Sequence, residues 1–283
     1  MAVTQTGLAH DSALARRDHP APAAGSADPA DRAPVVILAT GYSGASRLRS
    51  LLHLPDLAWT SGTGILPLSE QAAAVWRNAD GLPEGATLSR LAAASTRALT
   101  DSVITWILVR EGKRRWCEIC SAMPEVAETF AQLYPGTRFV CLHRSCPDFI
   151  RAVLDAGPWG IADPAFAVFA RSQPASTVAA LTAYWVAHTG SSLAFERSHP
   201  QAVLRIRFED LAAAEQQTTR TVMSFLGIAS LDGDAARTQD SQAAPEPGAP
   251  RAGTDFPTGR IPPAVLAQAN DLLRQLDYPP LPG

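Results

Sequence analysis

The stretch that decides the fold is Val35-Val36-Ile37-Leu38-Ala39, followed at once by Thr40-Gly41-Tyr42-Ser43-Gly44-Ala45-Ser46-Arg47. The first five residues form a short apolar run that is β-branched at its start, which is typical of a buried strand in a parallel sheet. Thr40 and Gly41 break the run. A helix is predicted from Ala45 or Ser46 to His53, because Pro55 cannot continue it. The sequence therefore predicts a strand, a tight turn and a helix.

The rest of the chain repeats this alternation of strands and helices. Further strands are predicted at 115–120, 138–142 and 202–208, and 57–68 reads as a loop that leaves room for a short strand. Helices are predicted at 70–78, 88–109 (whose end could instead be a strand), 123–134, 147–154, 176–195, 215–226 and 262–276. Alternating elements of this kind predict an α/β fold, a parallel sheet flanked by helices.

The domain boundaries follow from composition. Residues 1–34 are rich in Ala, Pro, Asp and Ser without an apolar period, which predicts a disordered leader. Residues 35–283 are expected to form a single domain. Within it, the polar and Pro/Gly-rich stretch 232–258 is predicted to be mobile.

Charge and hydropathy exclude several classes of partner. The formal net charge is −3, so no overall basic field would draw the chain to nucleic acid or an anionic membrane. The longest apolar runs are far shorter than the roughly 20 residues of a membrane-spanning helix, and the N-terminus lacks the pattern of a secretory signal. We therefore expect a cytoplasmic protein whose four cysteines do not form disulfides.

The turn after the first strand has the composition of an anion site. Glycines allow close approach of the backbone to a phosphate, and the N–H groups at a helix start point towards it. Ser43 and Ser46 would add hydroxyl donors. The alternative is a plain strand-to-helix turn, which also favours Gly and Ser. Because no Lys follows Gly44, the segment is not a Walker A loop, which weakens an ATPase or GTPase interpretation.

The same turn resembles the 5′-phosphosulfate loop of sulfotransferases, in which Lys or Arg precedes Ser-Gly-Thr-Thr. Here Tyr42 holds the basic position, and Ala45-Ser46 replaces Thr-Thr. The segment 139–148 (FVCLHRSCPD) is similar to the strand-and-arginine segment of that family that binds the nucleotide 3′-phosphate. Arg144 matches its arginine, whereas the usual serine partner falls at Ala152.

Two later segments extend the resemblance. Residues 203–211 (VLRIRFEDL) are similar to the late strand that ends in Tyr-Glu-Asp-Leu, with Phe208 at the position that lies near the adenine. Residues 253–260 match the nucleotide-covering loop and end at Arg260. Over residues 35–278 the chain thus resembles bacterial, actinobacterial-type sulfotransferases with a P-loop-like fold and a divergent 5′-phosphosulfate loop.

The resemblance implies a function. The donor would be 3′-phosphoadenosine 5′-phosphosulfate (PAPS), whose sulfuryl group passes to a hydroxyl or amine of a small-molecule acceptor, such as a secondary metabolite or glycolipid. No metal is implied. The nucleotide would contact Gly41, Tyr42, Ser43, Gly44, Ala45, Ser46, Arg47, Arg144, Phe208 and Arg260.

Transfer also needs a base and a cation. Glu70 is the first choice of base, Glu118 the second, and His143 and His188 are weaker candidates. Arg47 would supply the charge that the missing loop lysine carries in the family. The structural alternatives are a glutamate in the first turn of a helix for Glu70 and a solvent-facing helix residue for Arg47.

Three other functions remain open. The chain could bind a nucleotide or partner without transferring sulfate, because the family lysines are absent and Lys113 is the sole lysine. It could be a small-molecule kinase with a degenerate phosphate loop, although no good acidic Mg²⁺ ligand follows a strand. Cys117, Cys120, Cys141 and Cys146 could bind zinc, but Cys141 lies within a predicted strand and should point into a packed sheet.

Overall fold

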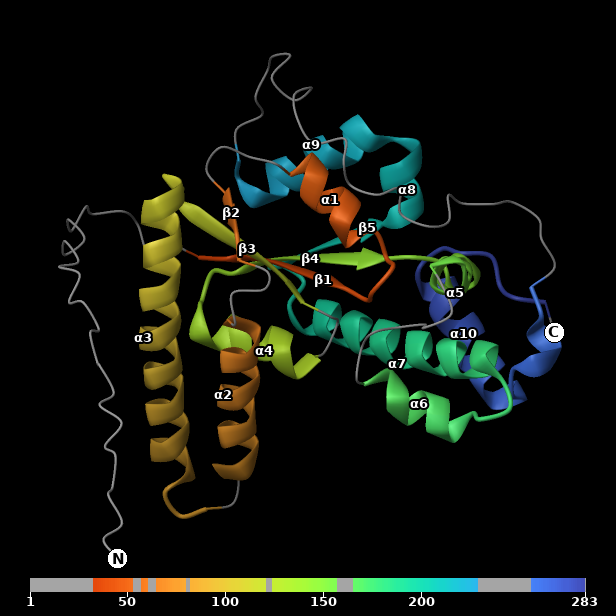
Figure 1. Ribbon diagram of the computed structural model, residues 1–283, viewed down its shortest axis with the longest axis horizontal. Helices are drawn as coiled ribbons and strands as arrows, with labels where there is room; N and C mark the ends of the chain where they lie inside the picture. The colour runs from red at the N-terminus through yellow and green to blue at the C-terminus, as the bar shows by residue number, and fades with distance from the viewer. Residues whose placement is uncertain are drawn as a thin grey trace, which may run out of the picture.

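The computed structural model describes residues 33–52, 57–60, 65–79, 82–120, 124–156, 165–228 and 256–282. At its centre lies a five-stranded parallel sheet in the order β2-β3-β1-β4-β5 (Figure 1). The strands are β1 (Val35–Ala39), β2 (Leu57–Trp59), β3 (Arg115–Cys120), β4 (Arg138–His143) and β5 (Val203–Arg207). The predicted α/β class and parallel sheet are confirmed.

The register brings the ends of the inner strands together. Residues 35–39 of β1 pair with 138–142 of β4, and residues 35–38 pair with 117–120 of β3. The carboxyl ends of β1, β3 and β4 therefore meet at one edge of the sheet. In open parallel sheets this is the edge where ligands bind.

The helices form two layers and two flanks (Figure 1). One face of the sheet carries α1 (Ala45–Leu51), α8 (Phe208–Ala213) and α9 (Glu215–Leu226). The other face carries α4 (Pro124–Leu133) and α7 (Thr177–Ser198). The flanks are the pair α2 (Ile65–Ala79) and α3 (Gly85–Glu111), and the group α5 (Cys146–Asp155), α6 (Phe166–Ser172) and α10 (Pro263–Gln275).

The core follows the alternation of side chains along β1. Val35, Ile37 and Ala39 pack with side chains of α1, α8 and α9, whereas Val36 and Leu38 pack with side chains of α3, α4 and α7. A third cluster joins α5, α7, α10 and the C-terminal tail. The central strand is thus buried on both faces, as its continuous apolar run predicts.

Three elements differ from the sequence prediction. Helix α2 begins at Ile65 and includes Pro67 in its first turn, where the missing N–H costs nothing. The prediction that Glu70 opens this helix is therefore wrong, because Glu70 lies in its second turn. Phe208 was expected to end a strand but is the first residue of α8, and α6 was not predicted at all.

The outer parts of the chain are only partly described. Ala33 and Pro34 precede β1 and are buried, and the Pro34 carbonyl accepts a hydrogen bond from the backbone N–H of Arg138. Residues 1–32 of the predicted leader, and 232–255 of the stretch predicted to be mobile, lie outside the described residues. No helix in the described ranges is long and apolar enough to span a membrane.

The four cysteines are buried, unpaired thiols spread over three apolar clusters. Cys117 belongs to the cluster under α1, Cys120 and Cys141 lie on the opposite face of the sheet, and Cys146, the first residue of α5, lies in the cluster with α7 and α10. The four do not converge on one zinc site, and Cys141 points into the packed sheet as expected. Among the residues described, no group of three or more His, Cys, Asp or Glu side chains could hold a metal ion.

A buried ionic network joins β4, α7 and β5. The Glu196 carboxylate of α7 lies 2.6 Å from Nε2 of His143 at the end of β4 and accepts a 2.7 Å hydrogen bond from Nε of Arg205 in β5. Burial raises the pKa of Glu196, but hydrogen bonds and charges from His143 and Arg205 outweigh it, and the net pKa is lowered. The ionised carboxylate therefore stabilises the folded state.

Glu196→Gln should lower the free energy of unfolding by about 1–3 kcal/mol at neutral pH, because buried polar partners lose a charged acceptor. The contribution of Glu196 is present above the ordinary pKa of 4.5 and is lost as the pH falls through the lowered folded pKa. The stability curves of the variant and the parent should therefore converge in acid, as urea unfolding across pH would show. Glu111→Gln, at an exposed position, serves as the control, and parallel curves at all pH values would contradict this role.

Candidate functional site

The turn between β1 and α1 is tightly organised. Thr40 and Ser43 are buried and their hydroxyls form a hydrogen bond, while the backbone N–H of Ser43 donates to the Thr40 carbonyl at 3.2 Å. Tyr42 and Gly44 have positive φ angles of 63° and 98°. Gly44 is the N-cap of α1 and offers no side chain to cap the first turn. The predicted turn and the start of its helix are therefore where the sequence placed them.

Gly44 is required by a close neighbour as well as by its backbone angle. A Cβ at this position would overlap the aromatic ring of Phe208, which lies directly against the turn. The ring also contacts Arg144, whose guanidinium carbon is 4.3 Å from the ring centroid. Three segments that are far apart in sequence, at Gly44, Arg144 and Phe208, are thus in contact.

Arg144 holds this arrangement together. Its side chain is 2% exposed, and Nη1 donates to the Tyr42 carbonyl at 2.7 Å. On the other side, Nε1 of Trp185 in α7 donates to the Arg144 carbonyl at 3.0 Å. The end of β4 is thereby fixed both to the turn and to α7.

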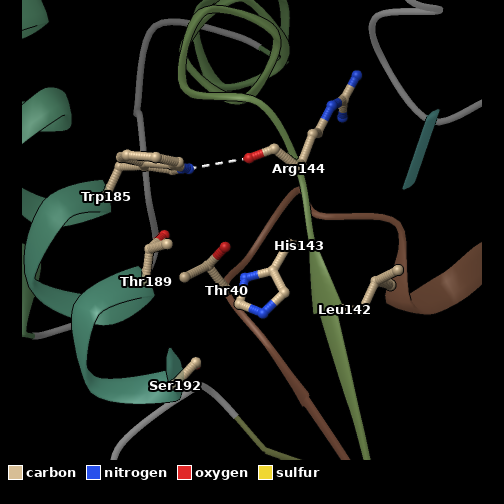
Figure 2. Close-up of a pocket in the computed structure, with 7 residues that line it drawn as sticks. All are labelled: Thr40, Leu142, His143, Arg144, Trp185, Thr189 and Ser192. Carbon is tan, nitrogen blue, oxygen red and sulfur yellow. Dashed lines mark hydrogen bonds between the residues drawn. The ribbon is translucent and has the colours of Figure 1, made fainter. Parts of the chain in front are cut away.

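A small polar cavity lies beside the turn. It has a volume of about 10 Å³, enough for roughly one water molecule, and it is lined by Thr40, Leu142, His143, Arg144, Trp185, Thr189 and Ser192. Figure 2 shows that the His143 ring faces this cavity near Thr40, whereas the Arg144 side chain points away from it. The strand ends therefore present hydroxyl and imidazole groups on one side and a guanidinium on the other.

Arg47 lies on α1, but its side chain contacts α9 and not the turn. Its Nη2 is 2.7 Å from Oε2 of Glu215 at the start of α9, and both side chains are about two-fifths exposed. In this conformation Arg47 is half of a surface ion pair.

The two candidate carboxylates have contrasting environments. Glu70 on α2 is exposed. Burial is the main cause that raises the pKa of Cys120, followed by the charge of Glu118 and then the charge of Glu70. Glu118 on β3 is buried and accepts a 2.7 Å hydrogen bond from the Thr60 hydroxyl. Of the two, Glu70 is the one that an acceptor could reach.

The other predicted site residues have the following places in the structure. Arg260 is exposed in the short 3-10 turn Thr258–Arg260. His143 is committed to Glu196, and the ring of His188 packs at 4.1 Å from that of Tyr184. Ala152 is fully buried within α5.

One positioning residue was not predicted. Oε1 of Glu209 in α8 accepts a 3.0 Å hydrogen bond from the backbone N–H of Ser145, and Oε2 accepts one from the Tyr278 hydroxyl at 2.5 Å. Burial, followed by the Glu209 charge, raises the pKa of Tyr278. Glu209 thus ties the C-terminal tail to the residue after Arg144. The sequence signal for Glu209 is its place in the Phe-Glu-Asp-Leu segment, directly after Phe208.

Comparisons with known proteins agree with this architecture. The family model described as "Sulfotransferase family" matches residues 34–232. A sulfotransferase domain from the curacin biosynthetic pathway is similar in structure, with 17% identity and a TM-score of 0.52, over 89% of this chain and 100% of that one. A second similar structure is the sulfotransferase domain of the Synechococcus PCC 7002 olefin synthase, with 16% identity and a TM-score of 0.53 over 89% and 97%.

At these identities the two structures are evidence for the fold alone. No curated protein sequence matches the chain significantly. The family model, however, spans well over half of the residues, including the turn after β1, Arg144 and Phe208. The chain belongs to the sulfotransferase family.

Proposed function

We propose that the protein transfers a sulfuryl group from PAPS to a hydroxyl or amine of a small molecule. The observation that carries this proposal is the convergence of three segments at one edge of the sheet. Arg144 bonds the carbonyl of Tyr42 and stacks on Phe208, and Phe208 packs on Gly44. The family uses the equivalents of these segments for one nucleotide, so their contact supports a shared site.

In this proposal each segment binds one part of the donor. Residues 41–47 hold the 5′-phosphosulfate end through backbone N–H groups and serine hydroxyls. Arg144 binds the 3′-phosphate, Phe208 stacks on the adenine, and Arg260 covers the nucleotide from the C-terminal segment. Acceptors are expected among secondary metabolites or glycolipids, and the four unpaired, buried thiols favour a reducing compartment such as the cytoplasm.

Donor binding requires a local rearrangement. Arg144 is buried against the turn, and Phe208 covers Gly44 in the structure. A phosphate is a stronger partner for the Arg144 guanidinium than the neutral Tyr42 carbonyl, because it carries opposite charge and can form a bidentate pair. The nucleotide would therefore displace the carbonyl from Arg144 and the ring of Phe208 from the turn.

The transfer step places the acceptor opposite the leaving phosphate. The acceptor oxygen or nitrogen attacks the sulfur while the bond from sulfur to the bridging phosphate oxygen breaks. Glu70 takes the acceptor proton, and Arg47 and the turn stabilise the charge that builds on the leaving phosphate. For this role Arg47 would leave Glu215.

Arg144→Ala should weaken binding of 3′,5′-diphosphoadenosine by roughly 10–100-fold and that of adenosine 5′-phosphate much less, because only the first ligand carries a 3′-phosphate. Titration calorimetry with both ligands measures this difference. Arg138→Ala, at the exposed start of β4 on the opposite edge, is the control. Arg144→Lys, which keeps the charge, should retain part of the preference if the alanine variant is unstable. Equal loss for both ligands would contradict the assignment.

Arg47→Ala should lower both donor affinity and kcat, because its charge would meet the phosphate in the ground state and the transition state. Glu215→Gln is the informative comparison, since it breaks the same ion pair while leaving Arg47 free to turn to the donor. Donor binding should be unchanged or tighter in Glu215→Gln. If both variants lose affinity and rate equally, Arg47 acts only through its ion pair.

Glu70→Gln should lower kcat by about 10²–10⁴-fold with little change in nucleotide affinity, as expected on removal of a general base. A panel of alcohols, phenols and amines must first supply an acceptor. Glu128→Gln is the matched control, because Glu128 pairs at 3.6 Å with His199, just before the start of β5 at the opposite edge. If Glu70→Gln turns over at the parental rate, Glu70 is not the general base, and His143 and Glu118 are the next candidates.

A second function is favoured by a specific observation. The basic position of the turn is occupied by Tyr42, and Arg144 and Phe208 fill the space beside it. A protein that binds a nucleotide or a partner without transferring sulfate would account for these substitutions. Tight binding of 3′,5′-diphosphoadenosine with no sulfation of any acceptor in the panel would favour this function over transfer.

A further inference from the structure

Helix α3 has a second apolar face that points away from the core. Its inner side buries Thr100, Ile104 and Ile107. On the opposite side, large apolar side chains are 40–71% exposed at Leu88, Leu91, Leu99, Trp106 and Val109. At 3.6 residues per turn these positions fall within an arc of roughly 80°, together with Ser95 and Ser102. We call these seven residues the outer stripe.

The outer stripe has the spacing of a helix-pairing surface. Leu88, Ser95, Ser102 and Val109 are seven residues apart, and so are Leu99 and Trp106. A seven-residue period brings one side of a helix repeatedly to a partner helix. Figure 1 shows α3 at the outer edge of the molecule. An exposed apolar strip along such an edge is characteristic of an interaction surface.

We propose that a second copy of the chain covers the outer stripe, with the two α3 helices antiparallel about a two-fold axis near Ala98 and Leu99. A two-fold interface must be complementary to itself. Positions equally distant from this axis match in size: Leu88 would lie opposite Val109, Leu91 opposite Trp106, and Ser95 opposite Ser102. Ala98, Ser95 and Ser102 leave room beside Leu99 at the centre, and larger apolar side chains lie towards both ends.

The charges at the two ends of α3 favour the antiparallel direction. The N-terminal end carries Glu84, whereas the C-terminal end carries three cations and one anion, namely Arg110, Glu111, Lys113 and Arg114. An antiparallel pair sets the acidic end of one helix beside the basic end of the other, and it also opposes the two helix dipoles. A parallel pair would bring like ends together.

The size of the outer stripe sets the strength of the dimer. A helix of 27 residues is about 40 Å long. With a strip about 10 Å wide, roughly 400 Å² per copy would be buried, below the ~800 Å² per partner of a standard stable complex. The dimer should therefore be weak and reversible. Trp106, with Arg110 at 4.6 Å over its ring, is the expected anchor.

Sedimentation of the full chain over a wide range of concentration tests the dimer. The parent should shift from monomer to dimer as concentration rises, and Leu99→Glu should weaken dimerisation at least about tenfold, because two charges would meet near the axis. Leu154→Glu on α5 and Val168→Glu on α6 alter similarly exposed apolar residues outside the stripe and should dimerise like the parent. Mixing Leu99→Glu with Leu99→Lys should restore dimers.

Crosslinking tests the direction of pairing. With a short thiol crosslinker, Ala98→Cys should form covalent dimers, because both copies lie near the axis. Leu88→Cys should not, since its two copies would lie about 30 Å apart, whereas a parallel pair would link both variants. The native cysteines are buried and do not compete.

The proposal fails if the parent stays monomeric at every concentration, or if Leu154→Glu and Val168→Glu abolish dimers as Leu99→Glu does. It also fails if the monomer binds lipid vesicles and Leu99→Glu alone loses that binding, which would assign the stripe to a membrane surface. Circular dichroism and thermal unfolding of Leu99→Glu must match those of the parent. If Leu99→Glu is unfolded, the sedimentation measurement is repeated with Leu91→Glu.

Discussion

The hydrogen bond from Arg144 to the Tyr42 carbonyl is the contact on which the candidate site depends. It joins the ends of two neighbouring strands, β1 and β4, and it fixes a turn whose residues have positive φ angles. Such backbone angles are unfavourable for Tyr42 unless surrounding contacts hold them. The guanidinium supplies one such contact, and the Phe208 ring, packed between Arg144 and Gly44, keeps the cation close to the turn.

Much of the fold could be predicted because β1 is a continuous apolar run and because short, largely apolar segments that alternate with helical patterns mark β3, β4 and β5. The central strand and the turn follow from local chemistry, and the helices predicted from 147 and 176 begin close to the N-caps Ser145 and Ser176. The start of α2 could not be predicted, since Pro67 reads as a loop signal although a first helical turn tolerates it. The transition from β5 to α8 at Phe208 has no connecting loop, so no turn residue marked it.

The candidate site could likewise be predicted only in part from the sequence. The resemblance to sulfotransferases predicted that the turn, Arg144 and Phe208 contact one nucleotide, and the parallel register of β1, β4 and β5 brings these segments to one edge of the sheet. The sequence could not show that Arg47 pairs with Glu215, that Glu118 is buried under Thr60, or that Glu209 links Tyr278 to Ser145. These contacts join residues at least 58 positions apart, and only the packing of the layers determines them.

The distribution of the cysteines also determines how the protein meets an oxidising environment. Burial is the leading cause that raises the pKa of every one of the four thiols, so the reactive thiolate is scarce at neutral pH. Peroxide and disulfide reagents act on thiolates that solvent can reach. The folded protein should therefore keep its thiols reduced through redox changes, and thiol oxidation would report unfolding of the chain.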